Sequence, residues 1–171
     1  MMKKLTSLDF SVAILAGISC LFMYLSVPVW ALFIGWAWYF TLGASADLIA
    51  KSIVPILTGA VLAVLAFVLI DAFGAFMPSM AATIAAVIIT VFVLMLTLKI
   101  PACNPSLVSF NAYSCIFVGY GAGEYMSIDG MPPLINALIW IAGANFIGML
   151  FGYASVKVTQ IFKSSKQMGG N

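Results

Sequence analysis

The sequence predicts an all-α, polytopic membrane protein, a single domain over residues 1–171 with six transmembrane helices. Two compositional observations predict this class: 64% of the residues are hydrophobic, with a mean hydropathy of +1.19, and only 7% are charged. A soluble domain has about 45–50% apolar and about 25% charged residues, so these values exclude a water-soluble chain. A third observation favours helices over a barrel, because the apolar stretches are continuous and do not alternate with polar residues.

Six apolar stretches come close to the roughly 20 residues that a helix needs to cross a bilayer. Residues typical of turns separate them, such as Pro28, Gly74 and Gly130. The second and fifth stretches are short, and either would also fit a half-helix that enters the membrane and returns on the same side. The predicted spans are residues 10–27, 29–44, 53–73, 79–98, 105–121 and 132–156.

The lysines favour six full crossings. With the N-terminus in the cytoplasm, all seven lysines fall on the cytoplasmic side, while Asp71, Glu124 and Asp129 fall outside. This distribution satisfies the positive-inside rule. Lys3 and Lys4 before an apolar stretch also resemble a signal peptide, but the apolar stretches that follow favour an uncleaved first span. The prediction is a multi-pass protein of the inner (cytoplasmic) membrane with both termini in the cytoplasm.

The two sets of three spans share an outline. Each has a long span, a short span, a polar loop with a carboxylate and then a long Gly/Ala-rich span. A shift of 78 residues aligns Gly43 with Gly121 and Pro55 with Pro133. An odd-numbered half inserts the second time upside down, so the outline predicts a 3+3 inverted repeat, as in many transporters. Few positions coincide, and a chance match among small residues explains them equally well.

The fifth span is the most polar, and Asn104, Asn111 and Ser114 share one of its faces at about 100° per residue. Buried amides are costly in a bilayer unless they are paired. These side chains therefore either bond neighbouring helices or line a path for a small polar solute. Trp36, on the aromatic second span, either packs in the core or narrows such a path. The candidate path-lining residues are Asn104, Ser109, Asn111, Ser114, Trp36 and Asn145.

No Lys, Asp or Glu side chain lies at the centre of a predicted span, which favours a passive route over a coupled pump. Asp47 and Glu124 follow the two short spans and are the candidate vestibule residues, although solvated loop acids explain both more simply. The chain has no His, three Cys without metal-ligand spacing and no phosphate-binding loop, so no metal, cofactor, enzymatic activity or ATP-driven transport is predicted. A net charge of +2 excludes a nucleic-acid binder.

Two functions are left. The first is a passive channel, facilitator or transporter for a small neutral or weakly polar solute, working as a homo-oligomer in the lipid bilayer. The second is an accessory or scaffolding subunit that binds a partner protein through Gly/Ala-rich helix faces. Small residues at helical spacing allow helices to associate in lipid, and the last span has such a row in Ala144, Gly148 and Gly152.

Two aromatic stretches carry a resemblance to a known family. Residues 30–40, WALFIGWAWYF, followed by Gly43, are similar to a signature of the YcdZ-type family of small bacterial inner-membrane proteins. Residues 146–153, FIGMLFGY, resemble the closing span of that family. The resemblance covers about residues 10–160. It implies a bacterial inner membrane, and it supplies no substrate and no site residues because the family is a domain of unknown function.

Overall fold

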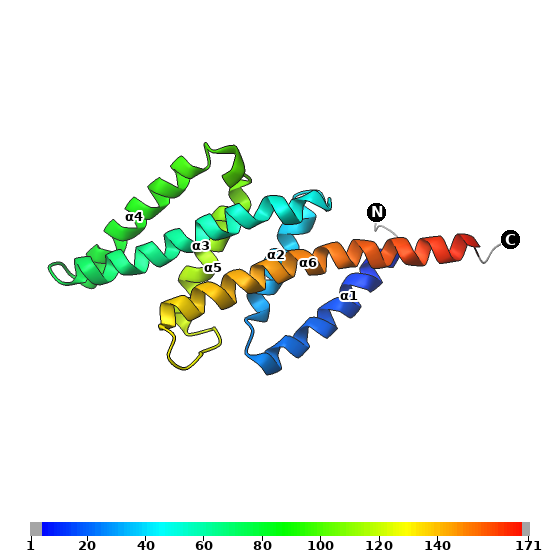
Figure 1. Ribbon diagram of the computed structural model, residues 1–171, viewed down its shortest axis with the longest axis horizontal. Coiled ribbons are helices and arrows are strands. Elements are labelled where there is room, and N and C mark those ends of the chain that lie inside the picture. Colours follow the sequence, from blue (N-terminus) through cyan, green and yellow to red (C-terminus); the bar gives the residue numbers. More distant parts are fainter. Residues whose placement is uncertain (1–4, 169–171) are drawn as a thin grey trace.

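The computed structural model describes residues 5–168, with side chains as far as residue 161 (Figure 1). Over this range every regular element is helical, which confirms the all-α prediction. Short 3₁₀ helices, η1 and η2, precede α2 and α5. The elements are α1 (Ser7–Ser19), η1 (Cys20–Leu25), α2 (Val29–Thr41), α3 (Asp47–Gly74), α4 (Ser79–Thr97), η2 (Pro101–Cys103), α5 (Ser106–Ala122) and α6 (Pro133–Met168).

Four of the helical segments are long and apolar enough to cross a membrane: α1 with η1, α3, α4, and α6 as far as Ile161. Large aliphatic side chains on them point outward; Ile14 and Ile88, for example, are 64% and 65% exposed. Continuous exposed apolar surface of this kind is unfavourable in water, so these helices indicate a membrane protein. The two predicted spans outside this set are the short ones: α2 has 13 residues, about 20 Å of helix, and α5 has 17.

The helix bounds differ from the predicted spans where the backbone turns. The second predicted span, 29–44, ends early because Gly43 and Ala44 both adopt positive φ, which no helix continues. The predicted loop over residues 45–52 is mostly the first turns of α3, and Pro55 lies inside that helix. The helix over the sixth predicted span is longer than predicted, because α6 continues past residue 156.

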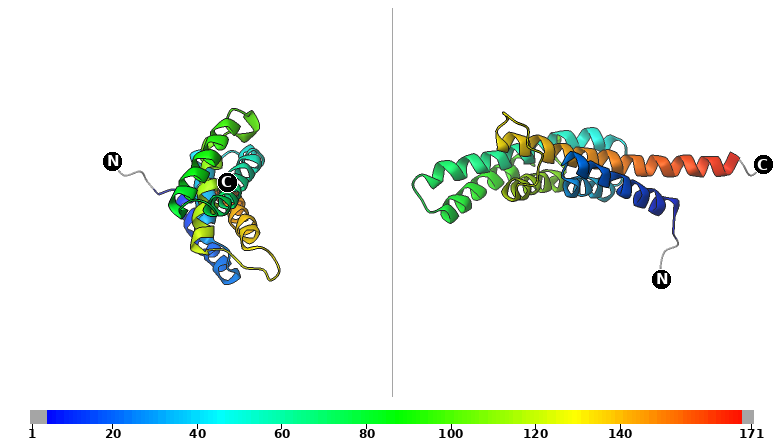
Figure 2. Two further views of the ribbon diagram at one scale, coloured as in Figure 1. Left: turned by 90° about the vertical axis from the view of Figure 1, so that its left-hand side faces the viewer. Right: turned by 90° about the horizontal axis from the view of Figure 1, so that it is seen from below.

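Two long helices, α3 and α6, form the centre of the molecule (Figure 1). The α4 helix packs against α3 on one side, and α1 packs against α6 on the other. The short helices cross the long ones, α2 on α6 and α5 on α3, and these are the most extensive helix pairs. Figure 2 shows the same layout from two further sides, with α6 extending beyond the other helices.

The short helices run parallel to the long helices that they cross. Along α2 and α6, Gly35 meets Asn145 and Tyr39 meets Gly152, so both chains advance in the same direction. Along α3 and α5, Gly59 meets Ser109, and the ring of Phe67 packs on Phe117 and Tyr120. The start of α1 lies beside the second half of α6, because the Ser11 hydroxyl donates to the Ser155 carbonyl oxygen at 3.0 Å.

These directions separate the charges of residues 5–161 into two ends. At the end where α3 and α5 finish and α6 begins, the charged residues are acidic; we call it the acidic end. The opposite end, where α3 and α5 begin, we call the lysine end. The acidic end carries Asp71, Glu124 and Asp129, and the lysine end carries Lys51, Lys99, Lys157, Asp9 and Asp47.

The two halves of the chain bury corresponding positions. Both short helices follow a proline, Pro28 for α2 and Pro105 for α5. When α2 is shifted by 77 residues onto α5, six of its seven buried residues coincide with buried residues of α5. Between α3 and α6 the shift is 89, which brings Gly59 onto Gly148, and seven of the eight buried residues of α3 coincide with buried residues of α6. A uniform shift of 78 therefore does not align the long helices, because the chain between matched positions of α5 and α6 is 12 residues longer than that between α2 and α3.

Candidate functional site

The two helix crossings bring backbone against backbone. A Cβ atom at Gly35 would fall on the carbonyl oxygen of Asn145, and one at Gly148 would fall on that of Leu32, so α2 and α6 each offer a glycine to the other. At the second crossing, a Cβ at Gly59 would fall on the carbonyl oxygen of Ser109. Only glycine permits such an approach, and small residues drive helix association in lipid for this reason.

Two candidate path-lining residues lie in these crossings and are fully buried. The Asn145 amide nitrogen donates to the Ala31 carbonyl oxygen at 2.7 Å and lies 3.6 Å from the Cys115 sulfur, while its Oδ1 atom has no hydrogen-bond partner. Ser109 donates to the Cys103 carbonyl oxygen at 3.0 Å. Asn145 therefore joins α2, α5 and α6 and keeps one free acceptor in a buried position.

The polar face predicted on the fifth span mostly serves its own helix. The half-buried Asn111 donates to the Leu107 carbonyl oxygen at 2.9 Å, and Ser114 donates to that of Phe110 at 3.0 Å. Asn104 precedes the helix and is exposed at the lysine end. Local hydrogen bonds of this kind satisfy the side chains without a partner helix.

Trp36 and Ser114 line two separate lateral cavities of about 170 Å³ each. The cavity beside Trp36 lies between α1 and α2, with Val12 and Phe40 on its walls, and the Trp36 ring packs at 5.5 Å from that of Phe151. The cavity beside Ser114 lies between α4 and α5. Both are walled almost wholly by apolar atoms, so neither resembles a route for a polar solute.

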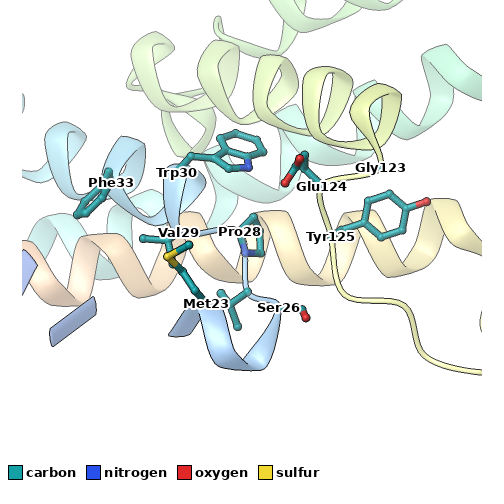
Figure 3. A pocket seen from close by; sticks show the side chains of 10 residues that line it. Met23, Ser26, Pro28, Val29, Trp30, Phe33, Gly123, Glu124 and Tyr125 are labelled. Atoms are coloured by element: carbon teal, nitrogen blue, oxygen red, sulfur yellow. The ribbon is translucent and has the colours of Figure 1, made fainter. Parts of the chain in front are cut away.

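A cavity of about 590 Å³ opens at the acidic end, and we call it the acidic-end pocket (Figure 3). The α1–α2 connection and the start of α2 form one wall, and the residues that follow α5 form the other. Its lining combines aromatic rings, aliphatic groups and one carboxylate, that of Glu124. The lining residues are Met23, Ser26, Val27, Pro28, Val29, Trp30, Phe33, Gly123, Glu124 and Tyr125.

The second vestibule candidate, Asp47, lies at the opposite end of the molecule from Glu124. It is exposed and forms an ion pair with Lys51 at 2.6 Å, one turn further along α3. An exposed i,i+4 pair of this kind contributes little to stability. Within residues 5–161, no three Cys, Asp or Glu side chains gather as the ligands of a metal ion would.

The eight candidate residues therefore do not share one lining. Asn145 and Ser109 lie in the two crossings, Trp36 and Ser114 line separate lateral cavities, and Glu124 lines the acidic-end pocket. What connects the pocket to a buried candidate is a short stack of contacts. A Cβ on Gly119 would meet Trp30 of the pocket and Ile141, one turn of α6 before Asn145.

One comparison with known proteins identifies the family. The family described as "Protein of unknown function (DUF1097)" matches residues 10–160. The chain belongs to this family. No curated protein and no solved structure matches it.

Sequence reasoning missed several residues that organise this DUF1097 fold. The sequence does not single out Gly35, within the aromatic second span, as the residue that contacts α6. Nothing local identifies Cys115 as the neighbour of Asn145. The buried hydrogen bond between Thr90 and Tyr113, at 2.9 Å, joins α4 to α5. Such pairs depend on which helices meet, and helical periodicity alone does not give that information.

Proposed function

We propose that this protein is a channel or facilitator in a bacterial inner membrane, as the resemblance to the YcdZ-type family implies. It would form a passive path for a small neutral or weakly polar solute. It would cross the membrane six times with both termini in the cytoplasm. The observation that supports the proposal best is the shared register of the two halves. Matching burial along α2 and α5, and along α3 and α6, is what a 3+3 inverted repeat produces.

Helix directions support six crossings. The α2 helix runs parallel to α6 beside residues 145–152, and α5 runs parallel to α3. Alternate crossings of a membrane run in the same direction, so second and sixth spans should be parallel, as should third and fifth. A short helix can span when neighbouring helices and local thinning of the bilayer accommodate it.

The proposed path starts in the acidic-end pocket and continues along the junction of α2, α5 and α6. Below the pocket, Trp30, Gly119 and Ile141 pack together, and the next layer holds Asn145 with Cys115. The free Oδ1 of Asn145 is a buried acceptor, and such groups in a membrane protein mark solute or water pathways. In this arrangement the side chains of Trp30 and Ile141 close the path.

Accessibility of Cys115 tests the path directly. When Trp30 and Ile141 move aside and open the path, a variant that keeps Cys115, with Cys20 and Cys103 replaced by Ala, should react in proteoliposomes with a membrane-impermeant methanethiosulfonate. The matched variant that keeps only Cys103 should react at least about tenfold more slowly, because Cys103 is buried outside this junction. Equal rates would contradict the path.

Flux tests the function. Proteoliposomes should take up acetamide, glycerol, acetic acid or water faster than protein-free vesicles in a stopped-flow assay. No added flux for any of the four would overturn the proposal.

The scaffolding alternative loses the row of small residues predicted on the last span, although Ala13 and Gly17 of α1 are exposed. The α6 row is covered by α2, since Gly148 meets Leu32 and Gly152 meets Tyr39. On α3, Gly59 is covered by α5. These small residues pack inside the chain, and the geometry favours the solute path. A homo-oligomer remains part of the proposal and would have to use other faces.

A further inference from the structure

We propose that the acidic-end pocket binds a small organic ammonium ion, held by the Glu124 carboxylate and the Trp30 indole in a lining that also includes Phe33 and Tyr125. The proposal goes beyond the solute path, since a ligand that binds here without crossing would satisfy it. A volume of about 590 Å³ lies in the range of small-molecule sites, about 300–1,000 Å³.

The chemistry of the lining selects the charge of the ligand. Glu124 is the only ionisable carboxylate in it, and no lysine lies in the lining to neutralise that group. The charges at this end of residues 5–161 are all acidic, which adds a field that attracts cations. An anion would meet repulsion here, and the pocket offers no cationic donor to hold one.

The aromatic rings favour an organic cation over a metal ion. Calcium takes six to eight oxygen ligands and magnesium an octahedral shell, whereas this pocket offers one carboxylate. Aromatic rings attract alkylammonium groups through their negative faces, and they also bury the methyl groups of such ions. Carboxylate and rings together therefore match a cation with apolar substituents.

The backbone holds these groups in place. Gly123 ends α5 in a left-handed conformation, and the Glu124 amide then donates to the Gly119 carbonyl oxygen at 2.9 Å. The Tyr125 ring stacks on Tyr120 with their centres 6.0 Å apart. Figure 3 shows the Glu124 carboxylate and the Trp30 indole projecting toward each other across the pocket.

Binding of choline to the full chain in maltoside micelles tests the proposal, because that detergent carries no ammonium group. Equilibrium dialysis should give saturable choline binding. The uncharged isostere 3,3-dimethyl-1-butanol should bind at least about tenfold more weakly, since it keeps the shape and loses the charge. Tetramethylammonium should displace choline better than potassium at equal ionic strength.

Three variants divide the contributions. E124Q should weaken choline binding at least about fivefold, and W30L about fivefold. D129N removes a nearby charge outside the lining and should change binding less than about twofold. Equal binding of the isostere, unchanged binding to E124Q, or an equal loss in D129N would each overturn the proposal. Should E124Q fail to fold, W30L and the isostere on the unmodified chain still decide.

The binding and flux outcomes are separable. Flux without choline binding overturns this inference alone. Choline binding without flux supports this inference and overturns the solute path.

Discussion

The two tight crossings of the molecule achieve the same close contact with different residues. Where α2 crosses α6, each helix contributes a glycine, Gly35 and Gly148. Where α5 crosses α3, only α3 contributes one, Gly59, and the position on α5 that corresponds to Gly35 is the buried Ala112. The polar content differs as well, because Asn145 in the first crossing corresponds to Ile56 in the second.

The difference shows that close approach of two helices needs only one glycine. The second glycine and the Asn145 amide of the first crossing therefore have a role other than close approach. Asn145 reaches across to Ala31 and lies near Cys115, so the first crossing also touches α5. The second crossing has no equivalent amide on α3. If the two halves descend from one unit, the polar junction is a specialisation of one crossing.

Breaking the first crossing should have the largest effect. Gly148→Ala places a methyl group on the Leu32 carbonyl oxygen, and the same methyl group lies 2.7 Å from the Trp36 backbone nitrogen. If the two helices separate to relieve this clash, the Gly35 contact is disturbed as well. We expect a loss of about 3 kcal/mol in unfolding free energy, measured by steric trapping. Gly143→Ala is the matched control on the same helix, since a Cβ there meets nothing within 4 Å. A control as damaging as the test variant would contradict this reading.

Gly59→Ala should break the second crossing with a somewhat smaller effect, about 2 kcal/mol. The added methyl group meets the Ser109 carbonyl, but the Tyr113 nitrogen lies at 2.9 Å and no second glycine is disturbed. Gly74→Ala, near the end of the same helix in open space, is the control. The same steric-trapping measurement would refute the comparison if Gly59→Ala proved the more costly of the two crossing variants.

The predictable part of this fold follows from local rules, and the rest follows from pairing. Continuous apolar stretches predict the long helices, and Pro28 and Pro105 predict the starts of the short ones, because a missing N–H costs little at a helix start. Sequence could not place Asn145 against Ala31, or separate Trp36 from Ser114 into different cavities, because both depend on which helices meet. Glu124 was identified as a vestibule residue, but Trp30 and Phe33, which line the same pocket, come from α2, a segment distant in the sequence.

Replacing the amide of the first crossing should separate function from stability. Asn145→Leu gives that position an apolar side chain, as Ile56 provides in the second crossing, and it removes both the Ala31 hydrogen bond and the unpartnered Oδ1. Hydrogen bonds between membrane helices contribute about 0.6 kcal/mol on average, so stability should change little. Solute flux in proteoliposomes should fall about tenfold, equivalent to about 1.4 kcal/mol.

Asn104→Leu, exposed at the lysine end, is the control for that variant and should keep its flux. Unchanged flux in Asn145→Leu would remove the amide from the proposed path and leave it as a packing residue.

The smallest expected effect lies beside the second crossing, at the hydroxyl of Tyr113. Tyr113→Phe keeps the ring that stacks on Phe117 and loses the 2.9 Å hydrogen bond to Thr90. Thr90 still donates to the Ala86 carbonyl oxygen, so no buried group is left without a partner. We therefore expect a loss of only about 0.5 kcal/mol. Tyr24→Phe, whose ring is exposed, sets the baseline, and a Tyr113→Phe loss above about 2 kcal/mol would mean that this bond, and not the Gly59 contact, holds the second half together.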